Sequence, residues 1–190
     1  VAAPDDANGD TFATYPYGTH SRNSWGGGFG LGTYYDAGDW RFGTSYKSPQ
    51  WFESYTFHTT NEIGLPRTVN YSLNLPQIYS VGTSYVGFEG VTLAADLRYL
   101  DYNSAKGFGD AGFNKDGSLS GLGLRSIFAV ALGAQFQWSN RLTTQLGYTW
   151  SENPVTSSQT MANITSPLLI QNMIATGLSY RVTDNLTMTM

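Results

Sequence analysis

The chain has 190 residues, no cysteine and a formal net charge of −4, and only 13% of its residues are charged. A soluble domain typically carries about 25% charged residues, so much of the usual solvating charge is missing. The acidic balance argues against a nucleic-acid partner, which would need a basic face, and the lack of cysteine excludes disulfide scaffolds and thiolate metal sites.

No stretch of the sequence approaches about 18 consecutive apolar residues, so a transmembrane helix is not expected. Low charge without long apolar runs is typical of strands that alternate between lipid and a polar lumen. The start of the chain at Val1 lacks a charged segment followed by an apolar run. We therefore expect no signal peptide here, and a chain that is either processed or a fragment.

Residues 1–24 predict a loop, because Asp, Asn, Gly, Thr and Pro dominate and no period is sustained. Asp6 to Asp10 space their oxygen ligands like the start of a calcium loop. Thr11 and Tyr17, however, stand where the calcium loop requires Gly and Glu. We therefore prefer an Asx-rich surface turn to a calcium site.

A hairpin is predicted next. Residues 29–35 alternate apolar side chains with glycines, Asp36–Asp39 forms the turn, and residues 40–47 return with rings on one face. Three inward glycines in the first arm indicate that a side chain, plug or ligand approaches the wall there. Pro49 cannot donate to a ladder, so it marks a kink, bulge or strand end.

The pattern continues with a third long strand within Arg67–Tyr85, interrupted by Pro76, and a fourth over Val91–Tyr102. The connection that follows, Asn103–Gly123, is predicted to be a long loop. Short turns and longer connections alternate along the chain, as they do in outer-membrane barrels, where the long loops are extracellular.

Ser126–Trp150 is the clearest hairpin in the sequence. Its first arm places Phe128, Leu132 and Trp138 on one face, with small and polar residues on the other. A membrane-spanning strand needs roughly 9–11 residues with aromatic girdles near its ends, and both arms meet that length.

The last predicted elements are a strand within Pro167–Tyr180 and the beginning of an eighth strand at Leu186–Met190. Asn172 is the polar exception on the apolar side of the former. An eighth strand of five residues is shorter than the roughly nine needed to span a bilayer. We therefore expect the chain to be part of a larger barrel.

Several phrases resemble the C-terminal half of outer-membrane transporters of the long-chain fatty-acid transporter (FadL-type) family, in the same order from about residue 25 onward. These are DWRFGTSYKSPQWFE (Asp39–Glu53), LPQIYSVGTSY (Leu75–Tyr85), LAADLRYLDY (Leu93–Tyr102), FAVALGAQFQWSNRLTTQLGYTWSENPV (Phe128–Val155) and SPLLIQNMIATGLSYRVTDNLT (Ser166–Thr187).

The resemblance implies an all-β fold, an antiparallel transmembrane β-barrel of which this chain supplies about 7–8 of 14 strands. Residues 1–190 would form a single partial barrel domain, with 1–24 an extracellular loop and 25–190 strands and loops. It further implies passive uptake of long-chain fatty acids or other hydrophobic compounds across the outer membrane of a Gram-negative bacterium, with lipid around the barrel. The family's N-terminal hatch, its early strands and a closing strand with a terminal aromatic are absent from this chain.

No catalytic set stands out, so we expect no enzyme. His20 and His58 are isolated, without a carboxylate cluster at ligand spacing, and no nucleophile elbow is present. We therefore predict no metal and no cofactor.

The residues that could meet a solute are those that alternation sends inward, since enclosed ionisable groups often mark a pathway. A fatty-acid carboxylate would bind one of the cations, an apolar tail would contact the aliphatic residues, and the prolines are candidate gates for sideways opening. These candidates are Arg41, Lys47, Arg98 and Asp96, then Ile78, Leu100, Ile127 and Met173, and the prolines Pro49 and Pro76. Alternatively, Asp96 and Arg98 join a salt-bridge network that only rigidifies the wall.

Two other functions stay open. One is a structural or adhesive outer-membrane barrel whose loops 103–123 and 151–166 bind partners; large inward side chains would favour it, whereas small ones dominate here. The other is a soluble all-β binding domain, which would have to cover its apolar face with a second sheet.

Overall fold

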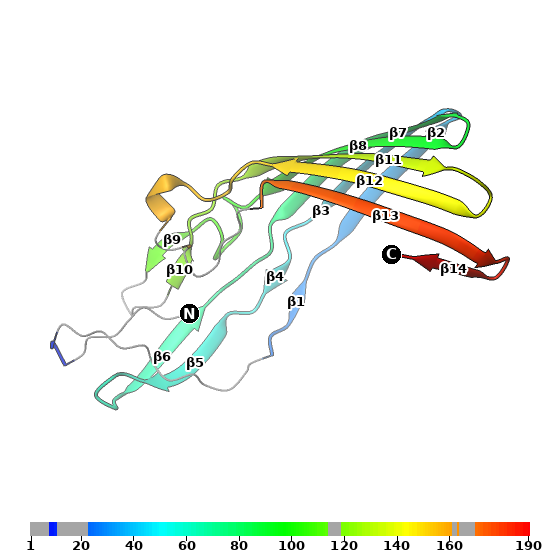
Figure 1. Ribbon diagram of the computed structural model, residues 1–190. Coiled ribbons are helices and arrows are strands. Elements are labelled where there is room, and N and C mark those ends of the chain that lie inside the picture. The colour runs from blue at the N-terminus through cyan, green and yellow to red at the C-terminus, as the bar shows by residue number, and fades with distance from the viewer. Residues whose placement is uncertain (1–7, 11–22, 114–118, 161–162, 164–169) are drawn as a thin grey trace.

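The computed structural model describes residues 8–10, 23–113, 119–160, 163 and 170–190. Its main element is one antiparallel sheet of eight strands, which confirms the predicted all-β class and strand count. From edge to edge the strands are β14 (Leu186–Thr189), β13 (Asn172–Thr183), β12 (Leu142–Ser151), β11 (Ile127–Gln137), β8 (Val91–Asp101), β7 (Gln77–Phe88), β3 (Trp40–Lys47) and β2 (Gly30–Ala37). Figure 1 shows these strands side by side in a curved, twisted wall.

Tight turns join the long strands at one end of the wall, the right-hand end in Figure 1. In the β2–β3 turn Gly38 has a φ of +78°, and its N–H donates to Asp36 Oδ1 at 2.9 Å. Gly90, with a φ of +70°, turns β7 into β8. In the β11–β12 turn Ser139 Oγ accepts the backbone N–H of Leu142 at 3.1 Å. Glycine and side-chain acceptors thus permit each reversal.

The longer connections lie at the opposite end (Figure 1) and contain small two-stranded sheets. These pair β1 (Gly26–Gly27) with β4 (Trp51–Phe52), β5 (Tyr55–Thr60) with β6 (Pro66–Tyr71), and β9 (Ala111–Phe113) with β10 (Leu119–Leu122); a short 3-10 helix, η1, spans Ser157–Gln159. The prediction that 103–123 is a plain loop is therefore wrong. Strands of three and four residues are too short for alternation to be visible in the sequence.

The connections between β8 and β11 form a compact cluster with a small hydrophobic core. Leu124, at 1% exposed, is its most buried side chain, and Ala105 and Leu119 are buried with it. The N–H of Leu124 donates to the Phe108 carbonyl at 2.8 Å. Burial here raises the pKa of the Tyr102 hydroxyl. We call residues 102–113 with 119–125 the loop cluster.

One face of the main sheet carries large apolar side chains that no other protein layer covers in the described part of the chain. Leu132 is 51% exposed, Leu146 52% and Ile174 74%. A soluble sandwich would bury such side chains under a second sheet. The arrangement therefore does not support the soluble alternative, and we call this surface the apolar face.

Aromatic rings border the apolar face at both ends. Between them lie mainly aliphatic residues such as Val81, Leu97 and Leu132. The loop-end girdle comprises Phe29, Tyr46, Tyr79, Tyr99 and Phe128, whose successive ring centroids lie 6.0, 4.9, 6.4 and 4.9 Å apart. The turn-end girdle comprises Trp40, Tyr85, Phe88, Phe136 and Trp138. Two such girdles around an apolar band are typical of membrane barrels.

A polar row begins directly beyond the loop-end girdle. Tyr46 donates its hydroxyl hydrogen to Gln77 Oε1 at 3.1 Å. The Gln77 amide donates to Asp101 Oδ2 at 2.7 Å, and the Ser126 hydroxyl donates to Asp101 Oδ1 at 2.6 Å. The rings therefore mark a boundary between an apolar band and hydrogen-bonded polar groups. In the described residues, no helix is long and apolar enough to span a membrane.

Candidate functional site

The face opposite the girdles, which we call the glycine-rich face, carries Gly43 opposite Gly82 and Gly133 opposite Gly147. None of these four glycines has a positive φ. A Cβ built on Gly133 or Gly147 would meet no atom closer than 3.9 or 3.7 Å, respectively. Neither the backbone nor close packing requires glycine at 133 and 147, so these residues leave free space beside the wall.

The structure brings four predicted ligand residues into one row of this face. Lys47 pairs with Ile78, Ile78 with Leu100, and Leu100 with Ile127. Neighbouring strands lie about 4.8 Å apart, so the row extends roughly 14 Å from Lys47 to Ile127. An ammonium group thus stands at one end of an apolar strip, which we call the Lys47 row.

Lys47 also borders a hollow of about 430 Å³, lined further by Gly26–Gly30, Gln50 and Phe52. The Lys47 side chain is exposed. Among the described residues, the Lys47 ammonium has no carboxylate within ion-pair distance, and the ion pairs Arg41–Asp36 and Arg125–Glu152 involve other side chains. A cation with open space beside it and an aliphatic strip behind it can hold the head and tail of an amphiphile.

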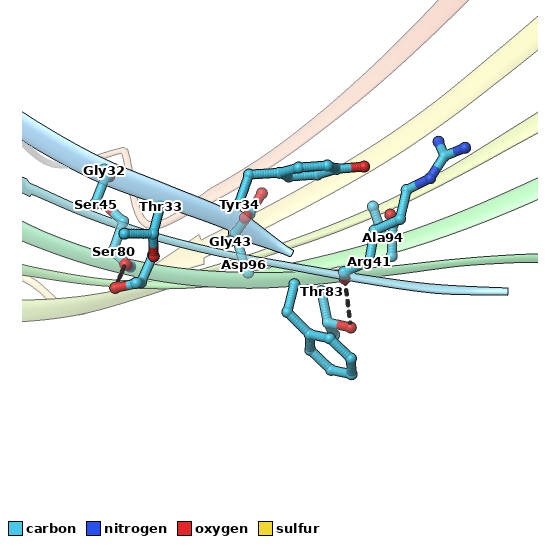
Figure 2. Close-up of a pocket in the computed structure, with 14 residues that line it drawn as sticks. Gly32, Thr33, Tyr34, Arg41, Gly43, Ser45, Ser80, Thr83, Ala94 and Asp96 are labelled. Atoms are coloured by element: carbon cyan, nitrogen blue, oxygen red, sulfur yellow. Dashed lines mark hydrogen bonds between the residues drawn. The ribbon is translucent and has the colours of Figure 1, made fainter. Parts of the chain in front are cut away.

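A second hollow, of about 510 Å³, contains Arg41 and Asp96 (Figure 2). Figure 2 shows Tyr34 and Arg41 projecting from the same side of the wall. Arg41 Nε lies 3.5 Å from Asp36 Oδ2, so its charge already has a partner. Asp96 pairs with Gly82 across the β7–β8 ladder. We call this the Asp96 hollow.

The other two predicted contacts, Arg98 and Met173, lie elsewhere on the same face. Arg98 pairs with Ser80 and Ala129, one row beyond the Lys47 row. Met173 pairs with Thr149 on the far side of the wall and is 52% exposed. The structure therefore does not bring Met173 to the Lys47 row.

The alternative that Asp96 and Arg98 join a salt-bridge network finds no support in the described part of the chain, where neither side chain forms an ion pair, whereas Arg41 pairs with Asp36 and Arg125 with Glu152. Asp96 and Arg98 are two residues apart on one strand, which separates their Cα atoms by about 6.6 Å.

The two prolines face each other in a break of the wall. The register that pairs Lys47 with Ile78 and bridges Gln50 to Leu75 places Pro49 opposite Pro76. Neither proline has an N–H, so neither can donate a backbone hydrogen bond to the strand beside it. On the side of the Pro49 segment that faces β1 and β2, the register shifts by one residue between the β2–β3 ladder and the β1–β4 ladder. This shift makes the Pro49 segment a bulge.

Sequence reasoning did not single out the hydroxyl groups that line the Asp96 hollow. Those on the glycine-rich face belong to Tyr34, Ser45, Ser80 and Ser84, and Thr33, Thr44 and Thr83 also line the hollow. The alternation of side chains along each strand already places the first four on the same face as Arg41. Alternation does not show which strands are neighbours, however, so it could not predict that the four line one hollow.

The structure contains no group of three His, Cys, Asp or Glu side chains suited to a metal ion within the described residues. His58 Nδ1 lies 3.2 Å from Thr68 Oγ1, and His20 lies outside the described residues. Asp6 of the possible calcium loop also lies outside them. Asn8 Oδ1 accepts the Asp10 N–H at 2.8 Å, which is an Asx turn.

In a comparison with solved structures, this chain matches about two-fifths of the length of a known transporter chain. The Pseudomonas putida toluene transporter TodX matches with a TM-score of 0.58 and 19% identity, over 87% of this chain and 41% of that one. A TodX deltaS2S3 mutant, described as a monoaromatic hydrocarbon channel, matches with a TM-score of 0.59 and 16% identity, over 85% and 42%. This chain has the fold of a TodX barrel segment.

At 16–19% sequence identity, the structural similarity establishes the fold alone. For the fold, it confirms the resemblance to FadL-type barrels that was predicted from the sequence. The chain spans about two-fifths of the length of the TodX structures. No protein-family model matches the chain, and a search of curated proteins finds no match.

Proposed function

We propose that this chain forms part of the wall of an outer-membrane channel for the passive uptake of hydrophobic compounds. The observation that carries the proposal is an uncovered apolar face between two aromatic girdles, backed by a glycine-rich face with free space and isolated charges. In a barrel, lipid contacts the first face and the second lines the passage. Passage of a hydrophobic solute requires no catalytic group and no cofactor.

The proposal also includes the architecture of the whole barrel and its orientation in the membrane. Residues 1–190 belong to one barrel domain of 14 strands in the outer membrane of a Gram-negative bacterium. Residues 1–24 and the loop cluster are extracellular, and the tight turns are periplasmic, because barrels of this class keep long loops outside. The TodX structures, described as a toluene transporter and a hydrocarbon channel, support a hydrophobic solute.

Among such solutes, the Lys47 row favours a long-chain fatty acid. Its carboxylate would bind the Lys47 ammonium, and its tail would cross Ile78, Leu100 and Ile127. Arg41 is a weaker candidate for the carboxylate, since Asp36 already neutralises it at 3.5 Å. Arg98, one row away, would serve as a second contact for the head group.

Uptake by the intact protein that carries this chain tests the proposal. Proteoliposomes should accumulate labelled oleate and toluene faster than empty liposomes, and without an ion gradient. Absence of protein-dependent uptake of both solutes, by protein shown to be folded, would contradict the channel and favour the adhesive alternative.

Replacement of Lys47 tests the fatty-acid site. Lys47→Met should weaken oleate binding roughly tenfold or more, since hydrogen bonds to charged groups contribute about 1.5–3 kcal/mol, and should leave toluene uptake unchanged. Lys106→Met, in the loop cluster, is the matched control. Equal oleate binding by both variants would remove Lys47 from the site.

The Pro49–Pro76 break is proposed as the place where the wall opens sideways. A disulfide between Gln50→Cys and Leu75→Cys, which bridge the break, should reduce uptake when oxidised. The 190 residues of this chain contain no other cysteine. Thr44→Cys with Val81→Cys, paired inside the continuous ladder, is the control. Unchanged uptake in the oxidised Gln50–Leu75 variant would exclude this gate.

A further inference from the structure

The Asp96 carboxylate lies directly over the backbone of the next strand. Its cross-strand partner is Gly82, and a Cβ built on Gly82 would overlap Asp96 Oδ1. Only glycine at 82 therefore leaves room for the carboxylate in this position. The side chain reaches from β8 across β7, toward the hollow that Arg41, Ser45 and Ser80 also line.

No cation neutralises this carboxylate in the described part of the chain. Arg41, in the same hollow, contacts Asp36 instead, at 3.5 Å. Arg98, two residues along β8, forms no ion pair with any of the residues that the structure describes. An ionised carboxylate on an enclosed channel wall is costly unless it is paired or wet. The arrangement thus leaves an acceptor available to a ligand.

The remaining polar groups of the hollow can donate and accept. Ser45, Ser80, Ser84 and Tyr34 contribute hydroxyl groups, and the hollow measures about 510 Å³, a volume in the range of sites for small organic molecules. With Asp96 they form a surface that accepts hydrogen bonds from a bound group and repels a second carboxylate.

We propose that the Asp96 hollow is a ligand subsite for hydrophobic solutes whose head group carries a hydrogen-bond donor or a positive charge, such as alkyl amines and alcohols. This inference rests on the proposed function, because it requires the glycine-rich face to line the passage. The wall then carries two head-group sites of opposite preference. The Lys47 row takes carboxylates, and the Asp96 hollow takes amines and alcohols.

Equilibrium binding of dodecylamine, dodecanol and dodecanoate to the intact protein in lipid nanodiscs, corrected for empty nanodiscs, tests this subsite. Asp96→Asn keeps the shape of the side chain and removes its charge, so it should weaken dodecylamine binding roughly tenfold or more, and dodecanol binding by less. Dodecanoate binding should be equal or tighter. Lys47→Met should show the reverse pattern.

Gly82→Ala provides a second variant that retains every charge. The added methyl group displaces the tip of the Asp96 side chain rather than backbone, so the protein should fold while dodecylamine binding falls. Gly133→Ala, where the nearest atom to the new Cβ lies 3.9 Å away, should leave it unchanged. Asp39→Asn, in the β2–β3 turn, removes one charge from elsewhere and should also leave it unchanged.

The outcomes separate the subsite from the channel. Unaltered dodecylamine binding in Asp96→Asn, while Lys47→Met still weakens dodecanoate, overturns the subsite and leaves the channel standing. Equal weakening of dodecylamine by Asp39→Asn and Asp96→Asn also overturns it, since the effect would then be one of net charge. Failure of the natural protein to bind any of the three solutes overturns both proposals.

Discussion

The Tyr148 hydroxyl donates a hydrogen bond of 2.7 Å to Asn172 Oδ1, from β12 to β13, on the apolar face. Asn172 was the polar exception in the sequence pattern of its strand. The bond provides a partner for the amide oxygen, which would be costly to leave unpaired if this face contacts lipid as proposed.

Removal of this bond should destabilise the barrel. Tyr148→Phe leaves the Asn172 amide without its donor and should lower the free energy of unfolding by about 1–3 kcal/mol. Tyr148→Phe combined with Asn172→Leu should recover most of the loss, because both polar groups are then gone. Reversible denaturant unfolding in lipid vesicles measures both variants. A double variant as unstable as the single one would contradict the assignment.

Adjacent residues on β11 allow a direct test of which face meets lipid. Leu132→Arg places a charge on the apolar face and should cost about 2–4 kcal/mol near the middle of the bilayer. Ala131→Arg points to the glycine-rich face, where Ala131 pairs with Asp96, and should cost less than about 1 kcal/mol. Unfolding titrations in vesicles compare the two, and equal costs would reverse or abolish the assignment of the faces.

The segment before Pro49 depends on one side chain. Ser48 is 1% exposed, and its Oγ accepts the Phe29 N–H at 2.9 Å. Ser48→Ala leaves that N–H without an acceptor and should cost about 1–3 kcal/mol, with faster hydrogen exchange at the Phe29 amide. Ser54→Ala, which removes an exposed hydroxyl bonded to Ser72, should cost less than about 0.5 kcal/mol. Similar exchange at Phe29 in both variants would argue against this role.

Leu124 should determine whether the loop cluster stays ordered. Leu124→Ala opens a cavity at the most buried side chain of the cluster and should cost about 2–5 kcal/mol locally. Limited proteolysis should then cut within 102–125 while the barrel strands remain protected. Leu65→Ala, at a side chain that is 56% exposed, is the control. Equal protease resistance in the two variants would show that the cluster does not depend on this core.

The sequence predicts the faces of the strands well, because the period of two depends only on the alternation of side chains. Lys47, Ile78 and Leu100 were correctly placed on one face in this way. Which of them are neighbours depends on register, and register depends on turns and bulges. An extra residue between Tyr85 and Phe88 shifts the β7–β8 ladder. Without it Ile78 would lie opposite Asp101 instead of Leu100.

The same limit applies to the irregular parts of the chain. Pro49 and Pro76 were each predicted to interrupt a strand, but their position opposite one another follows from pairings on both sides of the break. The Gly82–Asp96 contact likewise joins residues that look unrelated in sequence. In the loop cluster, short strands and turn bonds such as that from Leu124 to Phe108 have no period that a sequence could display.

The distance between the two girdles also has a consequence for the membrane itself. Phe128 and Phe136 belong to opposite girdles and stand eight residues apart on β11, which is roughly 26 Å of strand and, at a tilt of about 40°, roughly 20 Å of height. A typical hydrocarbon core is about 30 Å thick, and the bacterial outer membrane is thinner. If the chain forms the proposed membrane barrel, a bilayer thicker than the distance between the girdles has to compress around it, so thin bilayers should accept it more readily than thick, sterol-rich ones.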